Sequence, residues 1–126
     1  MIAVLALAGC NAMKPKPPAI PAVYLVFFHA WSADLTPEAK MIVDQAAARV
    51  KAAPPSTVAI AGYTFNDGTL DDNMRLARKR VSVVRDAMVA DGVDPKLFLD
   101  IPIGPADDGA GKTGDRRTEI RLQYGS

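Results

Sequence analysis

Cysteine and histidine are nearly missing from this chain of 126 residues, which contains one of each, Cys10 and His29. A single cysteine excludes an intrachain disulfide framework and a multi-cysteine metal site. Because no second histidine can join it, His29 is better explained as a hydrogen-bonded residue at a strand end than as a metal ligand. The same scarcity leaves no Ser/His/Asp or Cys/His set for nucleophilic catalysis, and we can name no carboxylate pair for hydrolysis. We therefore expect no metal, no cofactor and no enzymatic activity.

The chain also lacks a large excess of positive or negative charge and any long apolar run. The formal net charge is +1, and 23% of the residues are charged, so nothing attracts nucleic acid to the chain as a whole. Residues 1–9, MIAVLALAG, are apolar but far shorter than the roughly 20 residues of a spanning helix.

The residues Leu7-Ala8-Gly9-Cys10 resemble a lipobox, the cleavage and lipidation signal of bacterial lipoproteins. We expect residues 1–9 to be a signal segment, with Cys10 the lipidated first residue of the mature protein. The basic region that usually precedes such a segment is missing, which leaves open a true start upstream of Met1. The alternative is a buried or incidental cysteine. Residues 10–21 are rich in proline and predict a tether, and residues 22–126 predict one folded domain.

Four stretches predict β-strands, at residues 22–28, 57–61, 97–104 and 117–124. The first two are continuously apolar, which is typical of buried core strands. The second ends at Gly62, where a polar loop begins. Pro102 places the third strand at a sheet edge, because proline has no N–H to donate. Charged and apolar residues alternate in the fourth, so we expect one of its faces to be exposed.

Two segments between the strands predict helices. Residues 37–53 follow a capping residue, Thr36, and have proline at the first helical position. The second helix begins near Asp71, Asp72 and Asn73, which supply acids and a capping side chain. We expect one face of this helix to pack on the rest of the domain. The other face carries the basic residues Arg75, Arg78, Lys79, Arg80 and Arg85. The order β-α-β-α-β-β predicts an α+β two-layer sandwich, with two helices on one mixed sheet.

Residues 62–81, GYTFNDGTLDDNMRLARKRV, resemble the loop-and-helix motif of the OmpA-like domain family. That motif reads roughly G-H/Y-T-D-x-x-G-x-x-x-x-N-x-x-L-S-x-x-R-A. Residues 115–120, DRRTEI, resemble the closing N-R-R-V-E-I of the family. The resemblance covers about residues 24–122. It implies the OmpA-like fold and a peptidoglycan-associating module of outer-membrane proteins and lipoproteins, facing the periplasm.

The chain departs from the family pattern at several positions, among them Asp115, which stands for asparagine in the closing motif. Ala77 stands for serine and Val81 for alanine, which are mild changes. His29 and Trp31 stand where the family often has acids. Phe65 replaces the aspartate that, in the family, pairs with the ammonium group of diaminopimelate in the cell-wall peptide.

The resemblance assigns roles within the loop and the second helix. It implies that Arg80 binds the carboxylate of diaminopimelate, that Thr64 assists, and that Asn73 holds the shape of the loop. The ring of Phe65, or the carboxylate of Asp67, could take the place of the missing aspartate. Arg80 could alternatively be a solvated residue of the basic helix face.

Three functions compete. The first is a lipid-anchored outer-membrane protein that binds peptidoglycan weakly, and the second is a scaffold or protein-interaction module of the envelope that has lost this ligand. The third is a nucleotide-dependent enzyme, because residues 106–113, ADDGAGKT, fit a relaxed phosphate-loop pattern. We expect a flexible loop followed directly by a strand, so no helix would supply a dipole to phosphates, and Asp107 and Asp108 would repel them. We therefore expect neither nucleotide nor nucleic acid as a partner.

Overall fold

The computed structural model describes residues 22–107, 109 and 111–125. The predicted signal segment, lipidation site and tether lie outside the described residues. The chain order is β1 (Ala22–Phe27), α1 (Pro37–Ala52), β2 (Thr57–Thr64), α2 (Leu70–Ala90), η1 (Pro95–Leu97), β3 (Phe98–Pro105), α3 (Gly111–Asp115) and β4 (Arg117–Gln123), η1 being a 3-10 turn.

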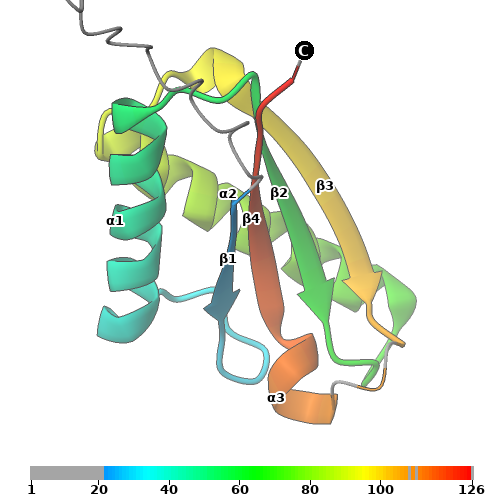
Figure 1. The fold of residues 1–126 in the computed structure, drawn as a ribbon. Helices are drawn as coiled ribbons and strands as arrows, with labels where there is room; N and C mark the ends of the chain where they lie inside the picture. Colours follow the sequence, from blue (N-terminus) through cyan, green and yellow to red (C-terminus); the bar gives the residue numbers. More distant parts are fainter. Residues whose placement is uncertain (1–21, 108, 110, 126) are drawn as a thin grey trace, which may run out of the picture.

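The four strands form one mixed sheet in the order β1-β4-β2-β3. Strand β4 pairs antiparallel with both β1 and β2, whereas β2 and β3 are parallel. Helices α1 and α2 pack on the same face of this sheet (Figure 1). The predicted α+β two-layer sandwich is therefore confirmed.

The core fills the space between the two helices and the sheet. Helix α1 contributes Val43 and Val50, helix α2 contributes Val84 and Met88, and all four are at most 2% exposed. The helix-facing sides of the strands supply the other large core residues. These are Val26, Val58, Ile60, Ile120 and Leu122.

The starts of the two long helices are set by threonine caps. The Thr36 hydroxyl accepts the N–H of Ala39, and Pro37 opens α1 as predicted. Helix α2 begins at Leu70, and its cap is Thr69, whose hydroxyl accepts the N–H of Asp72. The expectation that Asn73 caps α2 is therefore wrong, because Asn73 lies inside the first helical turn.

Gly62 lies inside β2, so the predicted strand end at Ala61 is wrong. A Cβ at Gly62 would come within 2.6 Å of Val81 Cγ2 and 2.7 Å of the Ala77 carbonyl oxygen. The missing side chain therefore lets α2 approach β2 closely. The strand continues to Thr64, at the site described below.

The two edge strands differ from one another in how well the sequence predicts them. Strand β3 lies at one edge and contains Pro102, as predicted. Strand β1 lies at the other edge and is not a buried core strand, because Val23, Leu25 and Phe27 are 54%, 43% and 44% exposed. A continuous apolar run cannot distinguish an edge strand with one open face from a central strand.

The face of the sheet turned away from the helices is partly covered by long polar side chains. Arg121 donates to the hydroxyl of Tyr63 and to Glu119, and the Arg117 guanidinium lies 4.2 Å from the centre of the Tyr63 ring. Ala59 on the central strand β2 remains fully buried. The alternation predicted for the last strand is confirmed.

Helix α3 corrects the prediction of a loop followed directly by a strand. It spans only five residues, Gly111–Asp115, and contains two glycines. So short a segment shows no apolar periodicity, which explains why the sequence pattern does not reveal it. In Figure 1 this helix lies at the end of the sheet opposite the C terminus.

Candidate functional site

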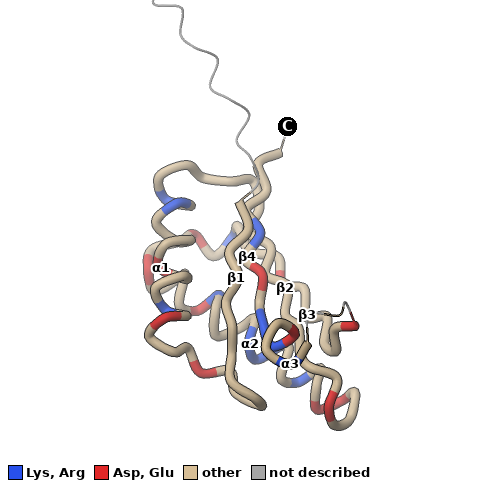
Figure 2. Tube along the Cα trace, turned by 60° about the horizontal axis from the view of Figure 1, so that its bottom comes forward, with Lys and Arg blue, Asp and Glu red and all other residues tan. Residues whose placement is uncertain are grey.

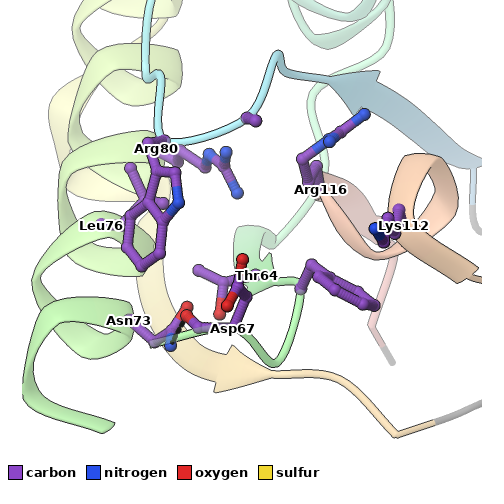
Figure 3. A pocket seen from close by; sticks show the side chains of 10 residues that line it. Thr64, Asp67, Asn73, Leu76, Arg80, Lys112 and Arg116 are labelled. Atoms are coloured by element: carbon purple, nitrogen blue, oxygen red, sulfur yellow. Dashed lines mark hydrogen bonds between the residues drawn. The ribbon is translucent and has the colours of Figure 1, made fainter. Parts of the chain in front are cut away.

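A cavity of about 150 Å³ lies at the α3 end of the sheet (Figure 3). The loop after β1, the loop between β2 and α2, helix α2 and helix α3 meet around it. The five residues assigned to ligand binding from the sequence all line it: Thr64, Phe65, Asp67, Asn73 and Arg80. The other lining residues are Ala30, Trp31, Leu76, Lys112 and Arg116.

Arg80 is fully buried, although its helix carries several exposed cations. Its Nε donates to the Ser32 carbonyl at 2.8 Å, and its two terminal nitrogens donate at 3.0 Å to the carbonyls of Tyr63 and His29. The guanidinium carbon also lies 5.0 Å from the centre of the Phe28 ring. The alternative of a solvated Arg80 is therefore wrong, because its position places it on the packing face of α2.

These contacts fix the Arg80 guanidinium between β2 and the loop after β1. A guanidinium has five N–H groups, so the three bonds leave one hydrogen on each terminal nitrogen uncommitted within the described residues. Burial, and secondarily the charge of Arg116, lower the pKa of Arg80 to about 10. Arg80 therefore stays protonated near neutral pH, and an anion in the cavity would relieve the repulsion between the two guanidiniums.

Two buried polar side chains of the cavity have a group without a partner in the described part of the chain. Thr64 and Asn73 are each 1% exposed, and neither the Thr64 hydroxyl nor Asn73 Oδ1 has a hydrogen-bond partner. Buried polar groups in native proteins are rarely left unpaired. Both atoms are therefore suited to contact a bound molecule or ordered water.

The amide nitrogen of Asn73 holds the loop between β2 and α2. Nδ2 donates to the Asp67 carbonyl at 2.8 Å and to the Thr69 carbonyl at 2.9 Å. Two acceptors on this side fix the orientation of the amide, so Oδ1 is the atom left without a partner. The structure thus has the loop geometry that the resemblance implied for Asn73.

Phe65 occupies the position of the family aspartate with a partly buried ring. The Nζ of Lys112 lies 5.7 Å from the centre of that ring, a cation–π distance. Asp67 is exposed and, of the residues that the structure describes, is the only acidic one that lines the cavity. Two groups were considered as substitutes for the missing aspartate. The Phe65 ring already contacts a cation, Lys112, and Asp67 lines the cavity.

Of the five cavity residues that sequence reasoning missed, three are charged or aromatic. In the sequence, Lys112 belongs to the segment that resembles a phosphate loop, and Arg116 belongs to the closing motif. In Figure 2, basic positions lie close together where α3 and the start of β4 pass α2. Trp31 is the third. It has a positive φ of 55°, and its ring lies so close to Gly68 that a Cβ there would meet it at 2.8 Å.

Comparison with known proteins shows the family of this chain, since the OmpA family matches residues 27–118. The chain belongs to the OmpA family. Outer membrane protein A of Bordetella avium is 30% identical over 92% of the chain and 68% of its own length. The Escherichia coli protein named "Probable lipoprotein YiaD" is 35% identical over 77% of the chain, but the chain spans only 47% of that protein.

Among solved structures, the peptidoglycan-associated lipoprotein of Burkholderia pseudomallei superposes with a TM-score of 0.71 at 25% identity. The match covers 79% of this chain and 90% of that one. The OmpA family is not an enzymatic family, in agreement with the expectation from the sequence. In the part of the chain that the structure describes, no helix combines the length and apolarity needed to cross a membrane.

Proposed function

We propose that the OmpA-like domain of this protein binds peptidoglycan non-covalently through a diaminopimelate-type stem peptide. The observation that carries the proposal is the buried, protonated Arg80, fixed at a cavity beside two unpaired polar groups. A similar solved structure is that of a peptidoglycan-associated lipoprotein.

The chemistry of the cavity suits a carboxylate. Arginine presents a planar fork of N–H groups that can donate to both oxygens of a carboxylate. Arg80 needs no rearrangement to do so, because its hydrogen bonds to Ser32, Tyr63 and His29 already fix the fork. Thr64, with a hydroxyl that can donate or accept, completes the binding set.

Binding is expected to be weak, because Phe65 cannot pair with the ligand ammonium. Losing one partner of a desolvated charge pair costs on the order of 2 to 5 kcal/mol, and tenfold in affinity is about 1.4 kcal/mol. The replacement thus weakens binding by tens to thousands of times relative to a domain that keeps the aspartate. Asp67 can recover part of this loss if its side chain turns toward the ligand.

The second candidate is an OmpA-like scaffold that binds an envelope protein and no longer binds peptidoglycan. The observation that favours it is the contact between Lys112 and the Phe65 ring, which replaces an acid-and-ammonium subsite with a cation on an aromatic face. The two candidates differ in whether isolated cell-wall sacculi retain the protein.

A sacculus pull-down with the parent and four variants tests the proposal. We expect weak retention of the parent, stronger retention of Phe65→Asp, and loss of retention in Arg80→Ala and in Thr64→Val. Thr64→Val conserves side-chain volume, and it separates loss of binding from the loss of folding that Arg80→Ala could cause. Lys79→Ala, on the exposed side of α2, is the matched control and should bind like the parent.

Two results would contradict the proposal. If parent, Thr64→Val and a folded Arg80 variant are retained equally, the cavity is not the binding site. If Phe65→Asp gains nothing and the parent is not retained, the scaffold function replaces the binding function.

We further propose that this domain, residues 22–126, stands at the periplasmic face of the outer membrane. Residues 1–9 would be removed, Cys10 would carry the lipid anchor, and residues 10–21 would form the tether. The lipobox resemblance and the proline-rich composition support this arrangement. Two relatives named as lipoproteins, one from Escherichia coli and one from Pseudomonas putida, agree with it.

A further inference from the structure

The charges around the cavity do not balance a zwitterion. Among the residues that the structure describes, Arg80, Lys112 and Arg116 line it with three positive charges, whereas Asp67 supplies one negative charge. Figure 3 shows the three cationic side chains arranged around the space into which Thr64 projects. A free amino acid head group brings no net charge, so it leaves this excess in place. A carboxylate whose neighbouring amine is acylated brings one negative charge and reduces the excess.

The position that would receive a ligand ammonium already has a cation. Lys112 Nζ lies 5.7 Å from the Phe65 ring centre, and Phe65 stands where the family has its aspartate. A ligand ammonium there would be repelled by Lys112 and would meet no carboxylate at residue 65. The contact thus turns a subsite for positive charge into one that excludes it.

An unpaired buried acceptor elsewhere in the cavity can receive an amide N–H. Asn73 Oδ1 can only accept a hydrogen bond, and it has no donor within the described residues. An amide N–H supplies one donor without adding positive charge. Apolar surface for the acyl carbons is available on Leu76 and on the half-exposed ring of Trp31, both of which line the cavity.

We propose that this cavity selects diaminopimelate whose distal amine is acylated, as it is in cross-linked peptidoglycan, over diaminopimelate with a free distal amine. This inference rests on the proposed peptidoglycan-binding function and specifies its ligand. In this view Phe65 and Lys112 change the preference of the cavity, and the carboxylate contact to Arg80 is kept.

Two synthetic peptides test the preference: L-alanyl-γ-D-glutamyl-meso-diaminopimelate with its distal amine free, and the same peptide with that amine acetylated. Isothermal titration of the purified full chain should show about tenfold tighter binding of the acetylated peptide, which corresponds to about 1.4 kcal/mol. Lys112→Gln should reduce the difference in affinity between the two peptides, because it removes the cation from the Phe65 ring. Phe65→Asp should reverse the preference. Lys79→Gln makes the same charge change on the exposed side of α2 and should leave the preference unchanged.

The possible failures can be told apart. Equal or tighter binding of the free-amine peptide overturns the inference and leaves peptidoglycan binding intact. If that binding is lost in Asp67→Asn, the Asp67 carboxylate holds the ammonium. Displacement of the acetylated peptide by an equal concentration of inorganic phosphate shows a site selective for charge alone, which also overturns the inference. Binding of neither peptide overturns the proposed function itself.

Discussion

Replacing Arg80 by alanine should destabilise the domain even when no ligand is present. The substitution removes three hydrogen bonds from a cation to backbone carbonyls. Hydrogen bonds to charged groups contribute roughly 1.5 to 3 kcal/mol each, so the gross loss is about 4 to 9 kcal/mol. The carbonyls of Ser32 and His29 lie in the loop after β1, which Arg80 thereby ties to α2.

The opposing effect is the relief of a buried charge. Burial lowers the pKa of Arg80 to about 10, well below the ordinary value for arginine. At 1.36 kcal/mol per unit, this shift corresponds to a penalty of about 3 kcal/mol that alanine would not bear. The hydrogen bonds therefore outweigh the burial cost, and we expect a net loss of about 1 to 6 kcal/mol.

Urea or thermal unfolding of the purified protein measures this loss. For a domain of roughly 100 residues, 1 kcal/mol lowers Tm by about 4 to 8 °C, so Tm should fall by at least about 4 °C. Between about pH 6 and pH 8, Arg80 is protonated in both the folded and the unfolded protein. The difference in unfolding free energy between the parent and Arg80→Ala should therefore not change over this range.

Two further variants sharpen the test. Arg80→Lys keeps the charge, but an ammonium cannot match three carbonyls arranged around a planar fork, so it should remain clearly less stable than the parent. Lys79→Ala is exposed on the neighbouring position of the helix and should stay within about 0.5 kcal/mol of the parent. A folded Arg80→Ala within about 1 kcal/mol of the parent would refute the reasoning that these bonds hold the loop.

Three other outcomes are expected. Gly62→Ala should cost about 1 to 3 kcal/mol in urea unfolding, because its Cβ would lie 2.6 Å from Val81 Cγ2 and 2.7 Å from the Ala77 carbonyl; unchanged stability would show that α2 can shift freely. Cys10→Ser should abolish lipidation and membrane partitioning of the full-length product, since several acyl chains anchor far more firmly than one; a variant that stays membrane-bound with an unchanged N-terminal mass would contradict the anchor. Titration with Mg-ATP should give no heat attributable to Lys112, and a micromolar affinity lost in Lys112→Ala would show that the loop binds nucleotide.

The sequence predicts the fold well because its signals are local and repeated. The cap at Thr36, the alternation in β4 and the edge position of Pro102 each follow from the chemistry of one short segment. Gly62 is different. Its role depends on the close approach of α2, whose contacting residues follow Gly62 by more than a dozen positions. The segment around Gly62 alone therefore indicates the end of a strand and not a close contact with a helix.

The cavity is predicted only in part, for the same reason. The motif places Thr64, Asn73 and Arg80 at one loop and helix, and they do line one cavity. Lys112 and Arg116 reach the cavity because β4 returns between β1 and β2 and brings the segment before it to the same end of the sheet. Without that topology, Lys112 has no visible connection with Phe65, and Arg80 cannot be distinguished from the exposed cations beside it.

The burial of Arg80 bears on how the two candidate functions should be separated. Because Arg80 ties the loop after β1 to α2 and β2, folding alone would retain it in a domain that no longer bound peptidoglycan. Its presence therefore does not discriminate between binding and scaffold functions. The unpaired Thr64 hydroxyl and Asn73 Oδ1 favour a binding function, because folding gains nothing from burying a polar group without a partner. A scaffold would be expected to replace Thr64 by valine at no cost, whereas a binding domain loses a contact to its ligand. The Thr64→Val variant, stable but not retained by sacculi, is thus the observation that would separate the two functions most directly.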